Sequence, residues 1–356
     1  MPETIAFTGH VKRVQVLDEE GNADAGLEPQ VPPEELLSRY SWMLLCRTFD
    51  RKAVSLQRQG RSFTYTPFEG HEAIQITAAR LMDAKDWAFP CYRESAFYIT
   101  RGAPMHALFT YLKGHEDGMA IPDKTNDMPL SIPVGSQIAH APGAAYSQKL
   151  AKNGGLSVAF FGDGASSQGD FHEALNFAGI YKLPVVFICS NNQYAISTPR
   201  QLQTAAQTIA QRALGYGIEG VQVDGMDPLA MQVVLSAAFD RARKGDGATL
   251  IEALCYRFGP HSTADDPKKY REDAEADPWR KLDWASRYRK YLEKKGLWTQ
   301  ALEDKLQAEA TRLVEEAVAK AEEFKDSPAQ MFDFVYPQLT EELKRQKQEF
   351  NEVYGQ

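Results

Sequence analysis

Two short polar motifs, Gly162-Asp163-Gly164 and Asn191-Asn192, each follow an apolar run near the middle of the chain. Asp163 offers a carboxylate oxygen and Asn192 an amide oxygen, and the next loop offers the backbone carbonyl of Tyr194. Magnesium prefers near-octahedral oxygen ligands and usually binds through one or two carboxylates together with phosphate oxygens. These residue types therefore indicate a site for magnesium and a diphosphate, with Asp163, Asn192 and Tyr194 as metal ligands.

The glycines beside Asp163 fit the same chemistry, since Gly162 and Gly164 lack a Cβ and let the backbone approach a phosphate closely. A helix expected to begin near Gly169 would point its N-terminal amides toward the same anion. Two other interpretations compete. A lone Gly-Asp-Gly is usually a plain turn with a capping Asp. A dinucleotide fingerprint needs GxGxxG and an acidic residue at the next strand end, but here Ser167 replaces the third glycine and the next strand ends in asparagines.

Both motifs need strands to position them. The runs 156–161 and 183–189 are short and nearly continuously apolar, which is typical of parallel strands covered on both faces. A helix at 170–181 between them completes a βαβ unit with a right-handed crossover. Asn192 lies 29 positions after Asp163, a suitable interval for one crossover. Ligands bind at the carboxyl ends of the strands in such sheets, so both side chains should reach one crevice.

The rest of the chain extends this pattern. Strands are expected at 220–224 and 248–255 with a helix at 227–244 between them, and further helices are expected from Pro33 and over 72–82. The fold class is therefore predicted to be α/β, with a doubly wound, mainly parallel sheet. We expect an N-terminal extension over 1–32, the ligand-binding domain over 33–272, and a charged helical C-terminal region over 273–356 that serves packing or oligomer contacts.

Composition limits the classes of function. The chain has 356 residues, 43% of them hydrophobic, and a formal net charge of −8, which argues against nucleic acid as the main partner. It has no apolar run of transmembrane length and no apolar segment of the signal-peptide kind at its start, so no membrane partner is expected and a cytoplasmic protein is the default. The four cysteines are far apart, and we expect reduced thiols, most of them buried.

The run GDGASSQGDFHEALNFAG at 162–179, followed by SNNQYAISTP at 190–199, resembles the thiamine-diphosphate motif of 2-oxo acid dehydrogenase alpha subunits. The resemblance extends from about residue 33 past residue 300 and includes segments 89–94, 223–228 and 256–266. Relatives of this kind include the alpha subunits of pyruvate dehydrogenase and of branched-chain 2-oxo acid dehydrogenase. The resemblance implies the thiamine-diphosphate-binding fold, with thiamine diphosphate and Mg²⁺ as cofactors.

The resemblance also implies roles for single residues. Asp163, Asn192 and the Tyr194 carbonyl would hold magnesium, and His261 would be catalytic, moving protons or stabilising charge near the reacting end of the cofactor. The arginines could grip phosphate oxygens bidentately. The cofactor-binding set is Tyr92, Arg93, Ile132, Val134, Gly162, Asp163, Gly164, Ala165, Asn192, Arg257 and His261. The alternatives are surface ion pairs for the arginines and an ordinary loop position for His261. Core packing of Ile132 and Val134 is compatible with their role, in which the backbone of this stretch faces the aminopyrimidine.

The activity that the resemblance implies is oxidative decarboxylation of a small 2-oxo acid, with transfer of the acyl group to a lipoyl-bearing dihydrolipoyl acyltransferase. Segment 131–137 looks more like pyruvate enzymes than branched-chain enzymes, so pyruvate is the expected substrate and a branched-chain acid the alternative. Segment 66–71 is expected near the substrate. A beta subunit in an α2β2 heterotetramer would supply the activating glutamate, so the chain alone should be inactive. Two other hypotheses are a non-catalytic structural subunit and, third, a hydride-transferring Rossmann enzyme.

Overall fold

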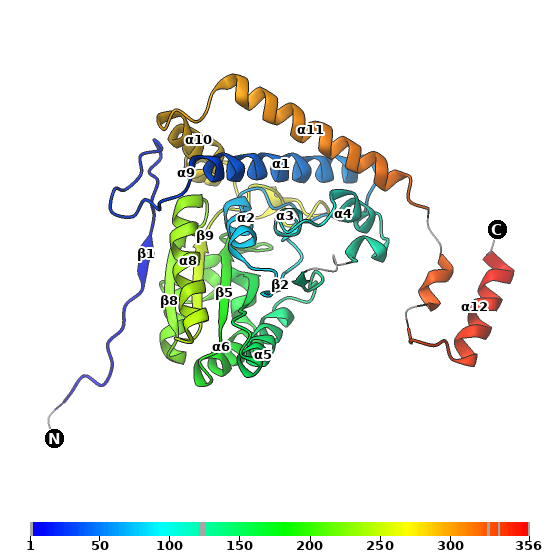
Figure 1. Cartoon of the computed structure of the whole chain (residues 1–356), viewed down its shortest axis with the longest axis horizontal. Helices are drawn as coiled ribbons and strands as arrows, with labels where there is room; N and C mark the ends of the chain where they lie inside the picture. The colour runs from blue at the N-terminus through cyan, green and yellow to red at the C-terminus, as the bar shows by residue number, and fades with distance from the viewer. Residues whose placement is uncertain (1–2, 121–124, 326–327, 334, 355–356) are drawn as a thin grey trace.

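The computed structural model describes residues 3–120, 125–325, 328–333 and 335–354. The predicted extension (1–32) and C-terminal region (273–356) each include residues outside these ranges. Figure 1 shows an α/β body, an N-terminal segment that leaves it in an extended conformation, and the C-terminal helix α12 standing apart from it. Within the described ranges, no helix is both long and apolar enough to cross a membrane.

Seven strands of the described residues form one sheet in the order β1-β8-β9-β5-β4-β2-β3. Each neighbouring pair in this sheet is parallel, which confirms the predicted α/β class. β4 and β5, the strands predicted on either side of the βαβ crossover, lie next to each other in the middle. In sheet order the strands are Lys12–Val14, Glu219–Asp224, Thr249–Leu254, Val185–Asn191, Ser157–Gly162, Trp87–Phe89 and Asn126–Asp127.

The central strands β4 and β5 are mostly apolar because helices cover both faces of the sheet there. Along β4, Val158 and Phe160 belong to one buried cluster, which also contains residues of α1, α2 and α8. Ala159 and Phe161 point the other way, into a second cluster with α5 and α6. This alternation is the two-residue period of a strand. The covering helices are α1 (Pro33–Arg58), α2 (Glu72–Leu81) and α8 (Pro228–Lys244) on one face, and α5 (Ser136–Ala151) and α6 (Gly169–Ile180) on the other.

The predicted helices are present, with small shifts at their ends. α1 begins at Pro33, with proline and acidic residues in its first turn, and α8 begins after Asp227, whose side chain accepts from two backbone amides of the first turn. α2 ends at Leu81, one residue earlier than expected. One local difference matters for the site: a 3-10 segment, Asp163–Ser167, separates β4 from α6.

Shorter elements complete the chain. The loop after β5 forms a small hairpin, β6 (Tyr194–Ala195) with β7 (Thr198–Pro199), followed by α7 (Arg200–Gln203). Further 3-10 segments lie at 116–119, 210–216, 267–269, 273–276 and 328–332. The helices not yet named are α3 (Ser95–Thr100), α4 (Met105–Leu112), α9 (Asp277–Leu282), α10 (Trp284–Lys294), α11 (Gln300–Glu322) and α12 (Glu341–Tyr354).

The C-terminal region is helical, as expected, and part of it packs on the body. Figure 1 shows α11 running alongside α1. Tyr40 of α1 contacts Trp284 of α10 edge to face and donates to Glu303 of α11. All four cysteines, Cys46, Cys91, Cys189 and Cys255, are free and buried, which confirms the expectation of buried thiols.

Candidate active site

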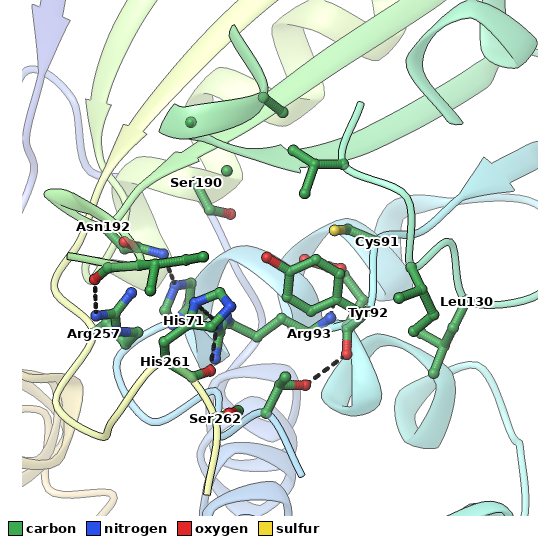
Figure 2. A pocket seen from close by; sticks show the side chains of 18 of the residues that line it. His71, Cys91, Tyr92, Arg93, Leu130, Ser190, Asn192, Arg257, His261 and Ser262 are labelled. Atoms are coloured by element: carbon green, nitrogen blue, oxygen red, sulfur yellow. Dashed lines mark hydrogen bonds between the residues drawn. The ribbon is translucent and has the colours of Figure 1, made fainter. Parts of the chain in front are cut away.

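The loops that follow five neighbouring strands, β9, β5, β4, β2 and β3, meet at the carboxyl end of the sheet. A cavity of about 650 Å³ lies there, where open α/β sheets bind ligands. Figure 2 looks into this cavity. Every residue that the sequence singled out lines it, so the structure brings the whole predicted set together: Tyr92, Arg93, Ile132, Val134, Gly162, Asp163, Gly164, Ala165, Asn192, Tyr194, Arg257 and His261.

Asp163 lies at the end of β4 and is 1% exposed. Its Oδ2 accepts a hydrogen bond from Gln203 Nε2 at 2.5 Å, and the same nitrogen donates to the Thr198 carbonyl. Burial raises the pKa of the Asp163 carboxyl, and the Gln203 hydrogen bond and the charge of Arg257 oppose that shift only in part. A carboxylate buried in this way favours a bound cation, because a cation compensates the lost hydration.

Asn192 follows β5 and is 6% exposed. Its Nδ2 lies 3.2 Å from Nε2 of His71, a contact drawn as a dashed line in Figure 2, and its Oδ1 accepts from the Tyr194 amide at 3.3 Å. Burial and the charge of Arg93 lower the pKa of His71 to about 3, so its imidazole is neutral at pH 7. The contacts with His71 and Tyr194 hold the Asn192 amide from both ends, and Asn192 follows β5, the strand next to the one that Asp163 follows.

Arg257 enters the cavity from the loop after β9 and is fully buried. Its guanidinium donates to the carbonyls of Tyr194 at 3.1 Å and Ile196 at 2.8 Å, and to the Tyr270 hydroxyl at 2.8 Å. The Tyr194 carbonyl, a predicted magnesium ligand, thus already uses one lone pair for Arg257. All three acceptors are neutral. Burial and the nearby charge of Arg93 lower the Arg257 pKa to about 10, so an anion in the cavity would stabilise this cation.

Arg93, from the loop after β2, is 6% exposed and donates to the carbonyls of Pro67 and His261. It also lies 3.3 Å from His261 Nδ1. Because a guanidinium only donates, this contact assigns Nδ1 as the acceptor and leaves the His261 proton on Nε2. Burial and the charges of Arg93 and Arg257 lower the His261 pKa to about 4. The Tyr92 ring meets the imidazole edge to face, with centroids 5.9 Å apart.

One wall of the cavity is apolar and open to solvent. Ile132 and Val134, from the loop after β3, are 58% and 47% exposed, so neither is packed in the core of this chain. A second apolar surface comes from α4 and the loop after β3, with Leu108, Leu112 and Leu130 lining the cavity. The cavity therefore has a charged end near the arginines and an apolar wall that the described residues leave partly uncovered.

The glycines of the first motif have different local roles. A Cβ on Gly162 would meet no described atom within 4 Å, so its backbone is open to a ligand, whereas a Cβ on Gly164 would lie 2.6 Å from that of Ala195. Packing against the hairpin thus explains Gly164 in this structure. In the same hairpin region Gln193 and Ile196 have positive φ angles of 76° and 55°, a strained conformation that is concentrated at functional sites.

Sequence reasoning missed several neighbours of the site. His71, the residue before α2, belongs to the segment predicted near the substrate, but its contact with Asn192 was not anticipated. Gln203 and Tyr270 lie behind Asp163 and Arg257 and carry no motif. The remaining unpredicted lining residues are Thr64, Tyr65, Cys91, Glu94, Ser95, Leu108, Tyr111, Leu112, Leu130, Gln168, Ser190, Ala195, Ile196 and Ser262.

The chain is similar along most of its length to members of one enzyme family. The model of the family "Dehydrogenase E1 component" matches residues 40–330. The chain is 42% identical over 354 residues to the "3-methyl-2-oxobutanoate dehydrogenase subunit alpha" of Mycobacterium tuberculosis, covering 98% of this chain and 96% of that protein. It is 39% identical over 342 residues to the "Pyruvate dehydrogenase E1 component subunit alpha" of Staphylococcus epidermidis and to that of Staphylococcus aureus, covering 95% of this chain and 92% of each relative.

Proposed function

The chain belongs to the dehydrogenase E1 component family, as an alpha subunit of a thiamine-diphosphate-dependent 2-oxo acid dehydrogenase, and from this premise we propose that it takes part in the oxidative decarboxylation of pyruvate. The acetyl group would pass to the lipoyl group of a dihydrolipoyl acyltransferase. The observation that carries the proposal is the charge arrangement of the cavity. It combines two guanidiniums, whose hydrogen-bond acceptors are neutral, with the buried carboxylate of Asp163, and the other buried acidic residue of the lining is Glu94.

These residues fit thiamine diphosphate and a magnesium ion. Arg93 and Arg257 would hold the diphosphate, since both line the cavity and each has N–H donors that no described acceptor uses. Asp163, Asn192 and the Tyr194 carbonyl would hold Mg²⁺, which prefers oxygen ligands and shares them with phosphate. Bound thiamine diphosphate would supply a nucleophilic carbon and an electron sink for the loss of carbon dioxide. Magnesium is part of the proposal because the donor set suits a hard cation.

His261 would act on protons at the reacting end of the cavity. With Nδ1 facing Arg93 and the ring neutral, its Nε2–H can donate to an oxygen on which negative charge develops. Its backbone amide donates to Asp265 Oδ2 at 2.8 Å, which fixes the loop that carries it. A positioned neutral imidazole of this kind contributes to catalysis by hydrogen bonding and by proton transfer.

A beta subunit would complete the site. Ile132 and Val134 line the cavity yet stay about half exposed, and a partner surface covering them would exclude water from the reacting end. That partner would also bring the glutamate that activates the aminopyrimidine. The assembly we propose is an α2β2 heterotetramer, in which cofactor binding and subunit association stabilise each other.

The substrate is tested by comparing kcat/KM for pyruvate with kcat/KM for the branched-chain 2-oxo acids. Segment 131–137, with its likeness to pyruvate enzymes, supports pyruvate. The branched-chain alternative is supported by the 42% identity to a 3-methyl-2-oxobutanoate dehydrogenase subunit. The reconstituted enzyme should be assayed with pyruvate and with the 2-oxo acids of valine, leucine and isoleucine. Pyruvate is expected to give the highest kcat/KM, and a clear preference for a branched-chain acid would replace it.

A further inference from the structure

We propose that His71 is a positioning residue that orients the side-chain amide of Asn192, so that the amide oxygen is presented to the metal. This inference rests on the proposed function, since it concerns the same metal site. His71 is 1% exposed, lines the cavity, and places Nε2 3.2 Å from Asn192 Nδ2. Figure 2 shows the imidazole between the turn that carries it and the Asn192 amide.

Hydrogen-bond geometry fixes the tautomer of His71. Its Nδ1 lies 3.0 Å from the Phe68 carbonyl oxygen. A carbonyl oxygen only accepts, so Nδ1 carries the proton. In the singly protonated ring Nε2 is then an acceptor, and the group facing it must donate. Of the two ends of the Asn192 amide only the NH₂ donates, and that end faces His71.

The lone pair of His71 Nε2 determines which end of the Asn192 amide faces the imidazole. Rotating its amide by half a turn would put the carbonyl oxygen against the lone pair of Nε2, which is repulsive, and would turn the NH₂ toward a cation. His71 disfavours that orientation and leaves Oδ1 as the ligand end. Groups behind a metal ligand often act in this way, and their loss typically costs about 10- to 100-fold in metal affinity or activity.

The turn that carries His71 is held by further buried contacts. The Asp50 carboxylate of α1 accepts from the Tyr65 hydroxyl at 2.6 Å and from the Phe68 amide at 2.9 Å. Gly70 has a φ of 103°, and a Cβ there would lie 2.0 Å from a backbone oxygen, so this position requires glycine. The imidazole therefore stands on a rigid support, as a positioning group should.

Two amide substitutions separate positioning from folding. His71→Asn places its terminal nitrogen near the position of Nδ1, so it keeps a donor for Phe68 but offers no acceptor to Asn192. His71→Gln places its terminal atoms near the position of Nε2, so it offers Asn192 an acceptor but loses the bond to Phe68. Thr77→Val is the matched control, because Thr77 is a buried residue of α2 whose hydroxyl has no partner among the described residues.

The measurement is Mn²⁺ binding in the presence of saturating thiamine diphosphate, followed by electron paramagnetic resonance on the chain assembled with its beta partner, with thermal unfolding measured in parallel. His71→Asn should weaken Mn²⁺ binding about 10- to 100-fold, while His71→Gln and Thr77→Val stay within about threefold of the unmodified chain. A merely structural role predicts instead that Mn²⁺ affinity falls in step with the melting temperature in both His71 variants, and that result would overturn the assignment.

A double substitution gives an independent check. If His71 acts through Asn192, adding His71→Asn to Asn192→Ala should cost no further Mn²⁺ affinity, whereas an additive loss would contradict the assignment. If the unmodified assembly shows no metal-dependent thiamine diphosphate binding, the proposed function fails and the assignment fails with it. Tight binding that His71→Asn leaves unchanged would overturn the assignment alone.

Discussion

Replacing Arg257 with methionine should specifically weaken binding of the diphosphate group. The guanidinium has five N–H donors, and its contacts with Tyr194, Ile196 and Tyr270 use three of them. Two donors remain on a fully buried cation. Methionine fills a similar volume but removes both the charge and these donors.

The size of the effect follows from this count. A hydrogen bond to a charged group contributes about 1.5–3 kcal/mol. Loss of one such bond to a phosphate oxygen should therefore weaken thiamine diphosphate binding about 10- to 150-fold, since about 1.4 kcal/mol corresponds to a factor of ten. Repulsion between Arg257 and Arg93 helps lower the Arg257 pKa to about 10. A bound diphosphate would offset this repulsion, which adds to the binding free energy that Arg257 provides.

Isothermal titration of thiamine diphosphate into the assembled enzyme, at fixed magnesium, measures this loss. Arg271→Met is the control for loosening of the same loop. Arg271 donates to the carbonyls of Arg257, Phe258 and Gly259 and lies outside the cavity lining. Arg257 does not bind the diphosphate if Arg257→Met binds thiamine diphosphate within about threefold of the unmodified chain, or if Arg271→Met loses as much affinity.

The same cavity leads to four further expectations. Asp163→Ala should weaken magnesium-dependent cofactor binding at least tenfold, about 1.4 kcal/mol, and unchanged magnesium dependence in a titration would remove Asp163 from the metal site. His261→Ala should lower kcat with cofactor affinity nearly intact, whereas a loss confined to KM in steady-state kinetics would indicate ground-state binding. The His261 pKa, lowered to about 4 by burial and by Arg93 and Arg257, should rise when inorganic diphosphate binds; an unchanged pKa in a histidine NMR titration would contradict this. Since the folded pKa lies below the ordinary 6.5, the stability that His261 contributes is present above pH 6.5 and is lost as the pH falls toward 4.

The parts of the fold that could be predicted are those with a strong local pattern. β4, β5 and β9 lie in or beside apolar runs, because both faces of a central parallel strand are covered. β1, β2 and β3 are two or three residues long, which is too short for an alternation of polar and apolar residues to be recognised. β1 lies in the segment expected to be an extension, yet Lys12–Val14 pairs with β8, and that pairing depends on a strand more than 200 residues away in sequence.

The residues of the candidate site also fall into two groups, those that the sequence could predict and those that it could not. Residues at strand ends and within motifs, such as Asp163 and Asn192, could be found because topology brings the ends of neighbouring strands together. The supporting contacts could not, since His71 and Gln203 reach Asn192 and Asp163 from 121 and 40 residues away in sequence. Nor does any local signal mark Leu108 and Leu112, which line the cavity from a helix that the sequence pattern did not indicate.

We propose that this chain carries the diphosphate half of an active site that a beta subunit completes. The most direct test is turnover of pyruvate with thiamine diphosphate, magnesium and an artificial electron acceptor, measured for the chain alone and after assembly with the beta subunit. We expect no turnover by the lone chain and cofactor-dependent turnover by the assembly. Substantial turnover by the lone chain would mean that it contains its own activating carboxylate, for which Glu94, buried in the cavity lining, would be the first residue to replace.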